Sequence, residues 1–245
     1  MGEALRIAAL VKRYNRHQAV AGADLAVAAG EAFGLVGANG AGKTTLIKCL
    51  LDLCAFDSGS IEIFGVTAHN PAARRRLAYL PERFNPPYYL RGREFLAVMS
   101  ELAGTRYEPS RALALLDELE LEREALERPA RALSKGMTQK LGLAGCFLLP
   151  RDLYVLDEPM SGLDAAARVA VKALLRRLAA QGRTLFFTSH VLADVDELCT
   201  SIAVLERGRV RFRGAPAALC TRYQEPSLER AFMRCIRDDE TATVS

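Results

Sequence analysis

The chain has no hydrophobic run long enough to cross a bilayer as a helix, which takes about 20 apolar residues. Hydrophobic residues nevertheless make up 50% of its 245 residues, enough for a sizeable core. The longest apolar stretch, residues 141–149, is too short and ends at Pro150. The N-terminus lacks the positively charged and then apolar layout of a secretion signal, and Arg6 stands where a myristoylation motif needs serine or threonine. We therefore expect any membrane association to depend on a partner.

Metal-binding spacings are also missing. The 6 cysteines form no C-x-x-C pair and no other ligand spacing, so we expect no structural metal. Cys49 and Cys146 lie in apolar helical patterns and are expected in the core, and the other cysteines are expected to be free thiols in a reducing cytoplasm. His17 and His69 have no ligand-spaced companions, which favours solvated structural roles.

Positive charge is in only small excess. The formal net charge is +4, with acidic and basic residues interspersed, which is too mild to indicate a nucleic-acid partner. The one dense basic patch, residues 74–76, is interpreted as a solvated helix face, with a phospholipid or partner contact as the alternative. No internal repeat or low-complexity linker occurs, and the length suits one large domain or one domain with a subdomain.

Residues 37–44 read G-x-x-x-x-G-K-T, the phosphate-binding loop. An apolar segment at 32–36 precedes it as a strand and a helical pattern at 45–52 follows, which is the context that the motif requires. Glycines let backbone N–H groups point at phosphates, and the helix dipole adds positive charge. We expect Lys43 to reach the β- and γ-phosphates and the Thr44 hydroxyl to ligate Mg²⁺. The residues expected to contact the nucleotide here are Gly37, Ala38, Asn39, Gly40, Ala41, Gly42, Lys43, Thr44 and Thr45.

Two adjacent carboxylates, Asp157 and Glu158, end an apolar segment at 153–156 that is typical of a central parallel strand. In isolation an acidic pair favours a helix cap or a solvated turn. Beside a phosphate loop, Asp157 is expected to hold the Mg²⁺ hydration shell, and Glu158 to polarise the water that attacks the γ-phosphorus. Such a base contributes ~10²–10⁴ in rate, or roughly 3–5 kcal/mol of barrier.

Further motifs follow in a fixed order. Residues 133–137 read LSKGM and are followed by Gln139, residues 161–164 read SGLD, and residues 188–190 read TSH. With the phosphate loop and the two carboxylates, they resemble the nucleotide-binding subunit of an ATP-binding cassette (ABC) transporter. The resemblance extends from about residue 5 to about residue 213.

The resemblance implies an α/β fold: a P-loop NTPase core with a mainly parallel sheet, an antiparallel β-subdomain and a helical subdomain at about 83–148. The ABC ATPase domain is expected to span 1–222, and a short C-terminal helical tail 223–245. Local patterns predict strands at 5–10, 18–27, 59–66, 184–188, 201–205 and 209–213, and helices at 110–120, 165–181 and 228–236. A further helix is expected to start near Met137, with Ser134 as its cap, and the polar end of the chain from Asp238 is expected to be frayed.

The resemblance also assigns roles to individual residues. Tyr14 is expected to stack on adenine, and His190 to hydrogen-bond the γ-phosphate. In this family two subunits pair head to tail, so Ser134 and Gly136 would contact the ATP that is held by Lys43 of the other subunit. Asp164 would align the two sites across the interface.

Two motifs depart from the usual family pattern. Glu82 stands where most members carry a glutamine that contacts metal and water, and it is expected to bind Mg²⁺ and to alter coupling rather than abolish activity. The signature has Lys135 and Met137 where glycine and glutamine are usual. Both changes resemble the branch whose membrane partners are of the ABC-2 type, many of them exporters.

The loop at 83–91 combines two prolines with three aromatic residues. It is either an ordinary surface loop or the edge of a groove that receives a short helix of the membrane subunit. The family places its coupling contact here, and aromatic residues are favoured at such anchors, so we favour the groove edge and expect Tyr88 and Tyr89 to contact the membrane subunit.

The function implied is an ATP-binding and ATP-hydrolysing subunit that powers substrate movement, expected to be export, through separate integral-membrane permease subunits. Its partners would be these permeases and a second ATPase subunit, in the simplest case a homodimer, and its location the cytoplasmic face of the membrane. The alternative is a soluble ABC-type ATPase acting on nucleic acid or ribosomes. Such proteins usually carry two cassettes, a coiled-coil insertion or zinc-binding cysteines, which are missing here, so we expect no nucleic-acid partner.

Overall fold

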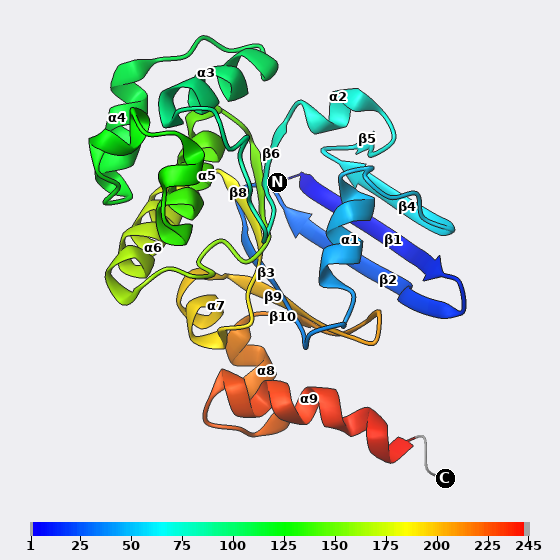
Figure 1. Ribbon diagram of the computed structural model, residues 1–245. Coiled ribbons are helices and arrows are strands. Elements are labelled where there is room, and N and C mark those ends of the chain that lie inside the picture. Colours follow the sequence, from blue (N-terminus) through cyan, green and yellow to red (C-terminus); the bar gives the residue numbers. More distant parts are fainter. Residues whose placement is uncertain (1, 243–245) are drawn as a thin grey trace.

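Two β-sheets and the helices around them form the fold (Figure 1). The computed structural model describes residues 2–242. In spatial order, the larger sheet contains β10 (Arg209–Gly214), β9 (Ser201–Glu206), β3 (Ala32–Val36), β8 (Thr184–Thr188), β7 (Leu153–Leu156) and β6 (Leu77–Leu80). The smaller sheet contains β2 (His17–Ala28), β1 (Glu3–Tyr14), β4 (Ser58–Ile63) and β5 (Val66–Thr67).

Strand direction distinguishes the two sheets. From β9 through β3, β8 and β7 to β6, neighbouring strands of the larger sheet run parallel, and β10 pairs antiparallel with β9. The smaller sheet is antiparallel throughout. This arrangement confirms the expected α/β fold with a mainly parallel core and an antiparallel β-subdomain. Every residue of β3, β7 and β8 is buried, as their mainly apolar sequences predict for parallel strands covered on both faces.

The α-helices connect and cover these strands. They are α1 (Lys43–Leu50), α2 (Pro71–Arg74), α3 (Gly92–Leu102), α4 (Pro109–Glu118), α5 (Lys135–Leu148), α6 (Ala165–Ala180), α7 (Leu192–Leu198), α8 (Pro216–Tyr223) and α9 (Leu228–Ala242). Short 3₁₀ turns occupy Arg123–Leu126 and Ala130–Ala132. No helix within residues 2–242 is both long and apolar enough to span a membrane.

Side chains of the larger sheet alternate between two hydrophobic cores. Phe33 and Phe186 stack at a centroid distance of 5.8 Å in the core that also holds α1 and the smaller sheet. On the opposite face, Phe147 and Tyr154 pack edge to face at 5.3 Å in the core formed with α3 to α6. The phosphate loop and the signature helix α5 therefore belong to different packing units, one on each face of the sheet.

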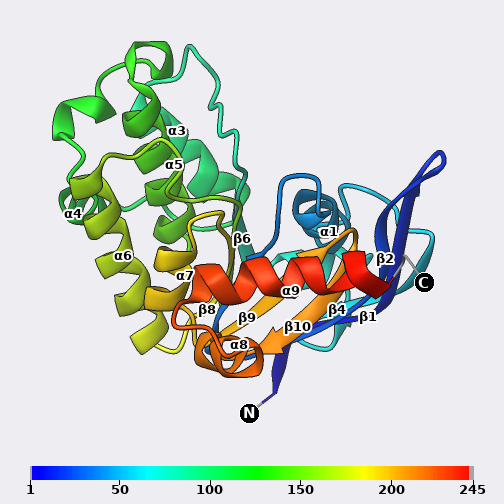
Figure 2. The same ribbon diagram turned by 90° about the horizontal axis from the view of Figure 1, so that it is seen from below.

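Several sequence expectations need correction. The strand expected at 59–66 is two strands, β4 and β5, separated by a turn in which Phe64 has φ 48° and Gly65 φ 75°. Helix α8 was not expected. Helix α9 continues through residue 242, so the prediction of a frayed end from Asp238 is wrong for 238–242, while 243–245 lie outside the described residues. Figure 2 shows α9 lying along β9 and β10.

In the basic patch at 74–76, Arg75 and Arg76 are exposed, as expected of a solvated face, but Arg74 and Arg76 also have specific partners. Arg74 donates to Asp52 at 3.1 Å, and the Arg76 guanidinium lies 3.7 Å from the centroid of the Phe64 ring while its Nε donates to Asp152 at 2.8 Å. The sequence could not show these partners, because Asp152 is 76 residues from Arg76.

Candidate functional site

The loop between β3 and α1 is shaped by close backbone contacts. A Cβ at Gly37 would lie 2.3 Å from the Leu205 carbonyl oxygen, and one at Gly42 would lie 2.3 Å from the Ala19 oxygen. Gly42 also has φ 110°, a conformation that side chains disfavour. Glycine is therefore required at both positions for the loop to curl around the N-terminus of α1.

Lys43 closes this loop from within. Its Nζ donates to the Gly37 carbonyl at 2.7 Å and to the Ala38 carbonyl at 3.2 Å, and the residue is only 9% exposed. Burial lowers the pKa of Lys43, and the nearby carboxylates of Glu158 and Asp157 oppose that shift. A desolvated ammonium that is held by carbonyl dipoles is well placed to bind an anion that enters the loop.

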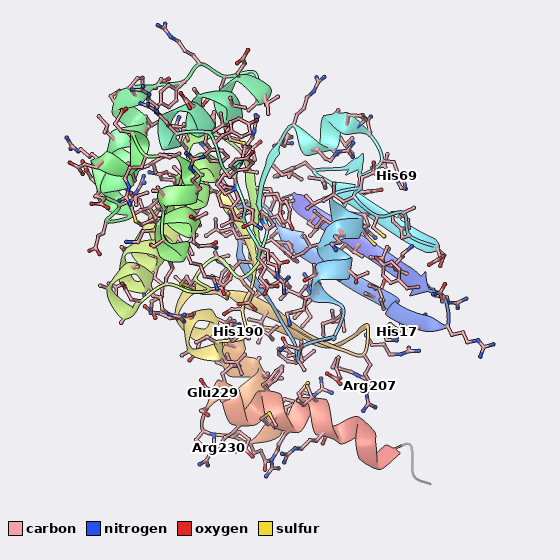
Figure 3. The ribbon with its side chains drawn as sticks, viewed as in Figure 1. His17, His69, His190, Arg207, Glu229 and Arg230 are labelled. Carbon is pink, nitrogen blue, oxygen red and sulfur yellow. The ribbon has the colours of Figure 1, made fainter. Side chains whose placement is uncertain are left out.

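An open cavity of about 540 Å³ lies over the loop. It is lined by Tyr14, His17, Ala19, Asn39, Gly40, Ala41, Gly42, Lys43, Thr44, Thr45, Glu82, Asp157, Glu158 and His190. Residues from the phosphate loop, from the end of β7 and from the segment after β8 thus meet in one place, as the motifs predicted. Figure 3 labels two of the lining side chains, His17 and His190. His69, labelled there too, lies apart from them and bonds Asp52 at 2.8 Å.

Asp157 is a buried carboxylate, 2% exposed, held between two hydroxyl groups. Thr188 Oγ1 donates to its Oδ1 at 2.6 Å, and Thr44 Oγ1 donates to its Oδ2 at 3.3 Å. Burial raises the pKa of Asp157, and these two hydrogen bonds oppose the rise. The negative charge of Glu82 raises the pKa of Asp157 further. The pairing of Asp157 with the Thr44 hydroxyl brings together two oxygen atoms that could both act as metal ligands.

Glu158 has an unusual backbone. Its φ of 49° lies in the left-handed region, which costs a non-glycine residue about 1–3 kcal/mol. The Glu158 N–H donates to Thr188 Oγ1 at 2.9 Å, and Glu158 Oε2 lies 2.8 Å from His190 Nδ1. Such strain persists only where the surroundings impose it, and here it aims the carboxylate at the cavity. His190 is 62% exposed, so its other ring nitrogen is open to a ligand.

Tyr14 stands at the rim of the cavity, 45% exposed. Its hydroxyl lies 3.2 Å from the Cys54 sulfur, and Lys12 Nζ lies 4.9 Å from the centroid of its ring. The contact with Cys54 and burial raise the pKa of Tyr14 to about 12, so the ring remains neutral at physiological pH. A neutral exposed ring at this rim is suited to stacking on a heterocycle.

The signature residues lie elsewhere. Ser134, Gly136 and Asp164 line a second cavity of about 400 Å³ and none of them lines the first. Ser134 Oγ accepts from the Met137 N–H at 3.2 Å and caps α5, and Asp164 Oδ1 accepts from the Ala167 N–H at 2.8 Å and caps α6. The expected Ser134 cap is confirmed, although α5 begins at Lys135, two residues earlier than expected. One chain thus brings together the phosphate-loop residues and the carboxylates but keeps Ser134, Gly136 and Asp164 apart from them.

Two residues that belong to the quoted motifs, but were given no role of their own from the sequence, take part in this geometry. Thr188 holds both Asp157 and the Glu158 backbone, and the buried Gln139 donates to the Pro159 carbonyl at 3.1 Å, so that α5 is tied to the segment after Glu158. The signal for Thr188 was its place at the end of an apolar strand beside His190. Nothing in the sequence indicated the partner of Gln139.

Comparison with known proteins places the chain in a family. The model of the ABC transporter family matches residues 20–161, which include the phosphate loop, LSKGM and the two carboxylates. This chain belongs to the ABC transporter family. It is 39% identical over 212 residues to the Nod factor export ATP-binding protein I of Burkholderia orbicola, covering 85% of this chain and 69% of that protein.

Further relatives agree with this assignment. An uncharacterized ABC transporter ATP-binding protein of Synechocystis sp. is 39% identical over 197 residues, but this chain spans only 56% of its length. A solved structure of an ATP-binding subunit of an ABC transporter superposes with a TM-score of 0.83 at 30% identity, covering 94% of this chain and 98% of that one. A dimeric ATP-binding cassette in a post-hydrolysis state with ADP and Pi superposes with a TM-score of 0.80 at 19% identity, covering 86% of this chain and 98% of that one. At this identity the similarity is evidence for the fold only.

Proposed function

We propose that this chain is the ATP-binding and ATP-hydrolysing subunit of an ABC transporter, which drives export of a substrate through separate permease subunits. One observation carries the proposal: Lys43, Asp157, Glu158 and His190 converge on a single cavity over the phosphate loop. The cavity combines an anion-binding loop, a metal-binding carboxylate and a candidate base, which are the components that phosphoryl transfer to water requires.

The residues around Thr44 fit a magnesium ion. The Thr44 hydroxyl and the Asp157 carboxylate lie within 3.3 Å of each other, and Glu82 lines the same cavity. Mg²⁺ is usually held by one or two carboxylates together with substrate phosphates, which matches this donor set. When bound, the ion would neutralise charge on the β- and γ-phosphates. The buried Asp157, whose pKa is raised, would gain a cation that favours its ionised form.

Glu158 is the proposed general base. Its carboxylate would accept a proton from a water molecule as the water oxygen bonds to the γ-phosphorus and the bond to the β-phosphate oxygen breaks, giving ADP and inorganic phosphate. His190, 2.8 Å from Glu158, would orient the carboxylate and present its exposed ring nitrogen to the γ-phosphate. Lys43 would stabilise the charge that develops on the phosphate oxygens.

The second cavity supports a two-subunit site. Ser134 and Gly136 stand at the N-terminus of α5, where free N–H groups and the helix dipole favour an anion. Since these residues lie outside the first cavity, they would complete the ATP site of a second copy that packs head to tail. We therefore propose a homodimer on the cytoplasmic face of the membrane, bound there by its permease partners.

The relatives support export as the direction of transport. One relative is named for Nod factor export, and the chain shares 39% identity with it. The departures at Glu82, Lys135 and Met137 agree with the branch whose permeases are of the ABC-2 type. We therefore propose export through an ABC-2-type permease.

ATP is expected to dimerise the Glu158→Gln variant. Removing the base leaves the nucleotide contacts in place but blocks phosphate release, so the closed dimer accumulates. Size-exclusion chromatography with light scattering should show the 26.8 kDa chain doubling in mass when ATP and Mg²⁺ are added, but not with ADP. If the variant binds ATP and stays monomeric, the proposed homodimer is wrong and a different chain must complete each site.

The exposed pair Tyr88 and Tyr89 is the proposed permease contact. The two rings, 66% and 63% exposed, pack edge to face at 5.4 Å in the loop before α3. Replacing both with alanine is expected to reduce recovery of the chain with native membranes several-fold, while ATP hydrolysis by the purified chain stays unchanged. Leu102→Ala, which removes an 80% exposed apolar residue from the end of α3, serves as the control. Equal membrane recovery of the tyrosine variant and the parent would show that the loop is an ordinary surface loop.

A further inference from the structure

Ion pairs join α6 to α7 along facing sides. Arg168, Lys172 and Arg176 are spaced by four residues and therefore lie on one side of α6. On α7, Asp194 accepts a hydrogen bond from Arg168, and its Oδ1 lies 3.8 Å from Lys172 Nζ. Glu197 contacts both Lys172 and Arg176. Figure 1 shows the two helices beside each other below the helical subdomain.

The two ends of this network differ in burial. At the inner end, the side chains of Arg168 and Asp194 are 26% and 6% exposed. At the outer end, those of Arg176 and Glu197 are 52% and 35% exposed. Separating the inner pair would leave the buried Asp194 carboxylate with only its longer, 3.8 Å contact to Lys172, whereas exposed pairs separate at little cost. The Arg168–Asp194 contact therefore links the first turn of α6 to the first turn of α7.

Each residue of the inner pair lies four residues after a residue of the proposed mechanism, with His190 placed just before the start of α7. Arg168 follows Asp164, which caps α6, and Asp194 follows His190, which contacts Glu158. The inner pair thus connects two segments that reach different cavities, since His190 lines the first and Asp164 the second.

We propose that Arg168 and Asp194 are positioning residues that couple the two ATP sites of the dimer. The inference rests on the proposed function, in which His190 contacts the γ-phosphate of its own site and Asp164 reaches the partner's site. When His190 shifts towards a γ-phosphate, α7 moves with it, the Arg168–Asp194 pair carries the movement to α6, and Asp164 is set for the second site. Loss of phosphate reverses the shift.

A purely structural role makes different predictions. If the pair only stabilised the fold, Asp194→Asn and Arg168→Gln would lower the melting temperature and leave dimerisation of the folded fraction unchanged. If the pair couples the sites, both substitutions weaken ATP-driven dimerisation. The effect of Asp194→Asn is the informative one, because Asp194 lies on α7 with His190 and not on α6 with Asp164. ATP binding to the monomer would be retained, because the phosphate loop is intact.

The test uses the full chain carrying Glu158→Gln as the parent, so that ATP is bound but not turned over. Arg168→Gln, Asp194→Asn and the double variant are added to it, with Arg176→Gln as the matched control at the outer end of the same helices. Sedimentation velocity with Mg²⁺ and ATP gives the dimer dissociation constant, a fluorescent ATP analogue gives the affinity of dilute monomer, and thermal unfolding reports stability. Arg168→Lys keeps the positive charge and tests whether the charge alone is enough for coupling.

Each single variant is expected to raise the dimer dissociation constant about tenfold, a normal size for coupling between sites. The double variant should be no worse than either single one, since both break the same link. Arg176→Gln should match the parent, and Arg168→Lys should recover most of the loss. Additive losses, or an Asp194→Asn variant that dimerises like the parent at equal stability, would overturn the proposal.

Hydrogen exchange on the same samples separates this inference from the homodimer itself. Binding of ATP to the parent should protect the amides of residues 161–168 even in a monomer, and Asp194→Asn should remove that protection. If the parent never dimerises but this difference is present, the homodimer is wrong and the link stands. If ATP protects 161–168 equally in both chains, the link is absent.

Discussion

The Glu158→Gln variant is expected to hydrolyse ATP about 10²–10⁴-fold more slowly than the native chain, equivalent to roughly 3–5 kcal/mol of barrier. Glutamine has the same shape as glutamate and can keep a contact with His190, but it cannot accept the proton of the attacking water. Glu158 has a left-handed backbone, and its side chain lines the cavity over the phosphate loop. Steady-state phosphate release at saturating ATP measures the loss.

Glu82→Gln is the matched control for this experiment. Glu82 lines the same cavity, and the substitution removes the same charge while restoring the residue that most family members carry. We expect it to change the rate by no more than a few-fold. A large loss from Glu82→Gln together with little loss from Glu158→Gln would mean that the base is Glu82 and that the assignment to Glu158 is wrong.

Lys43→Ala is expected to weaken ATP binding about 100-fold. The lysine would contact two phosphates, and hydrogen bonds to charged groups contribute about 1.5–3 kcal/mol each, so a total loss of about 3 kcal/mol is reasonable. Burial lowers the pKa of Lys43, which means that the empty protein disfavours its charged form, so we expect the melting temperature to change little. Equilibrium titration with a fluorescent ATP analogue measures the affinity.

Lys48→Ala provides the comparison, since Lys48 lies on the same helix with its side chain exposed. It should bind ATP like the native chain. Equal affinities of Lys43→Ala and Lys48→Ala would contradict the proposed role of Lys43. A fall in melting temperature confined to Lys43→Ala would show instead that its bonds to the Gly37 and Ala38 carbonyls hold the empty loop together.

Periodicity and local motifs predicted the buried strands well. The strands at 32–36 and 184–188 have the predicted bounds, because a strand covered on both faces leaves a nearly continuous hydrophobic signal, in β8 flanked by Thr184 and Thr188. Helix α8 was missed because its sequence, PAALCTRY, is too short for a clear period, although Pro216 at its first position is a starting signal. The length of α9 beyond Asp238 was missed since its polar end lacks that period.

The site was predictable where the chemistry lies within one motif. The spacing of residues 37–45 and of the pair Asp157 and Glu158 was enough to identify them as candidate site residues. Contacts between motifs could not be predicted, because they depend on how distant segments meet in space. The clamp of Thr188 on Asp157 spans 31 residues, and the bond from Gln139 to the segment after Glu158 spans 20. The left-handed backbone of Glu158 has no signature in its residue type.

The position of Cys54 has a practical use. Its sulfur touches the hydroxyl of Tyr14 at the cavity rim, while Cys49, Cys146, Cys199 and Cys235 are buried. Apart from Cys54, only Cys220, on the distant α8, is partly accessible. With Cys220 replaced by serine, the chain would carry one accessible attachment point for a thiol-reactive dye, beside the ring of Tyr14 that is proposed to contact adenine. Occupancy of the site could then be followed optically in real time, without adding any residue to the protein.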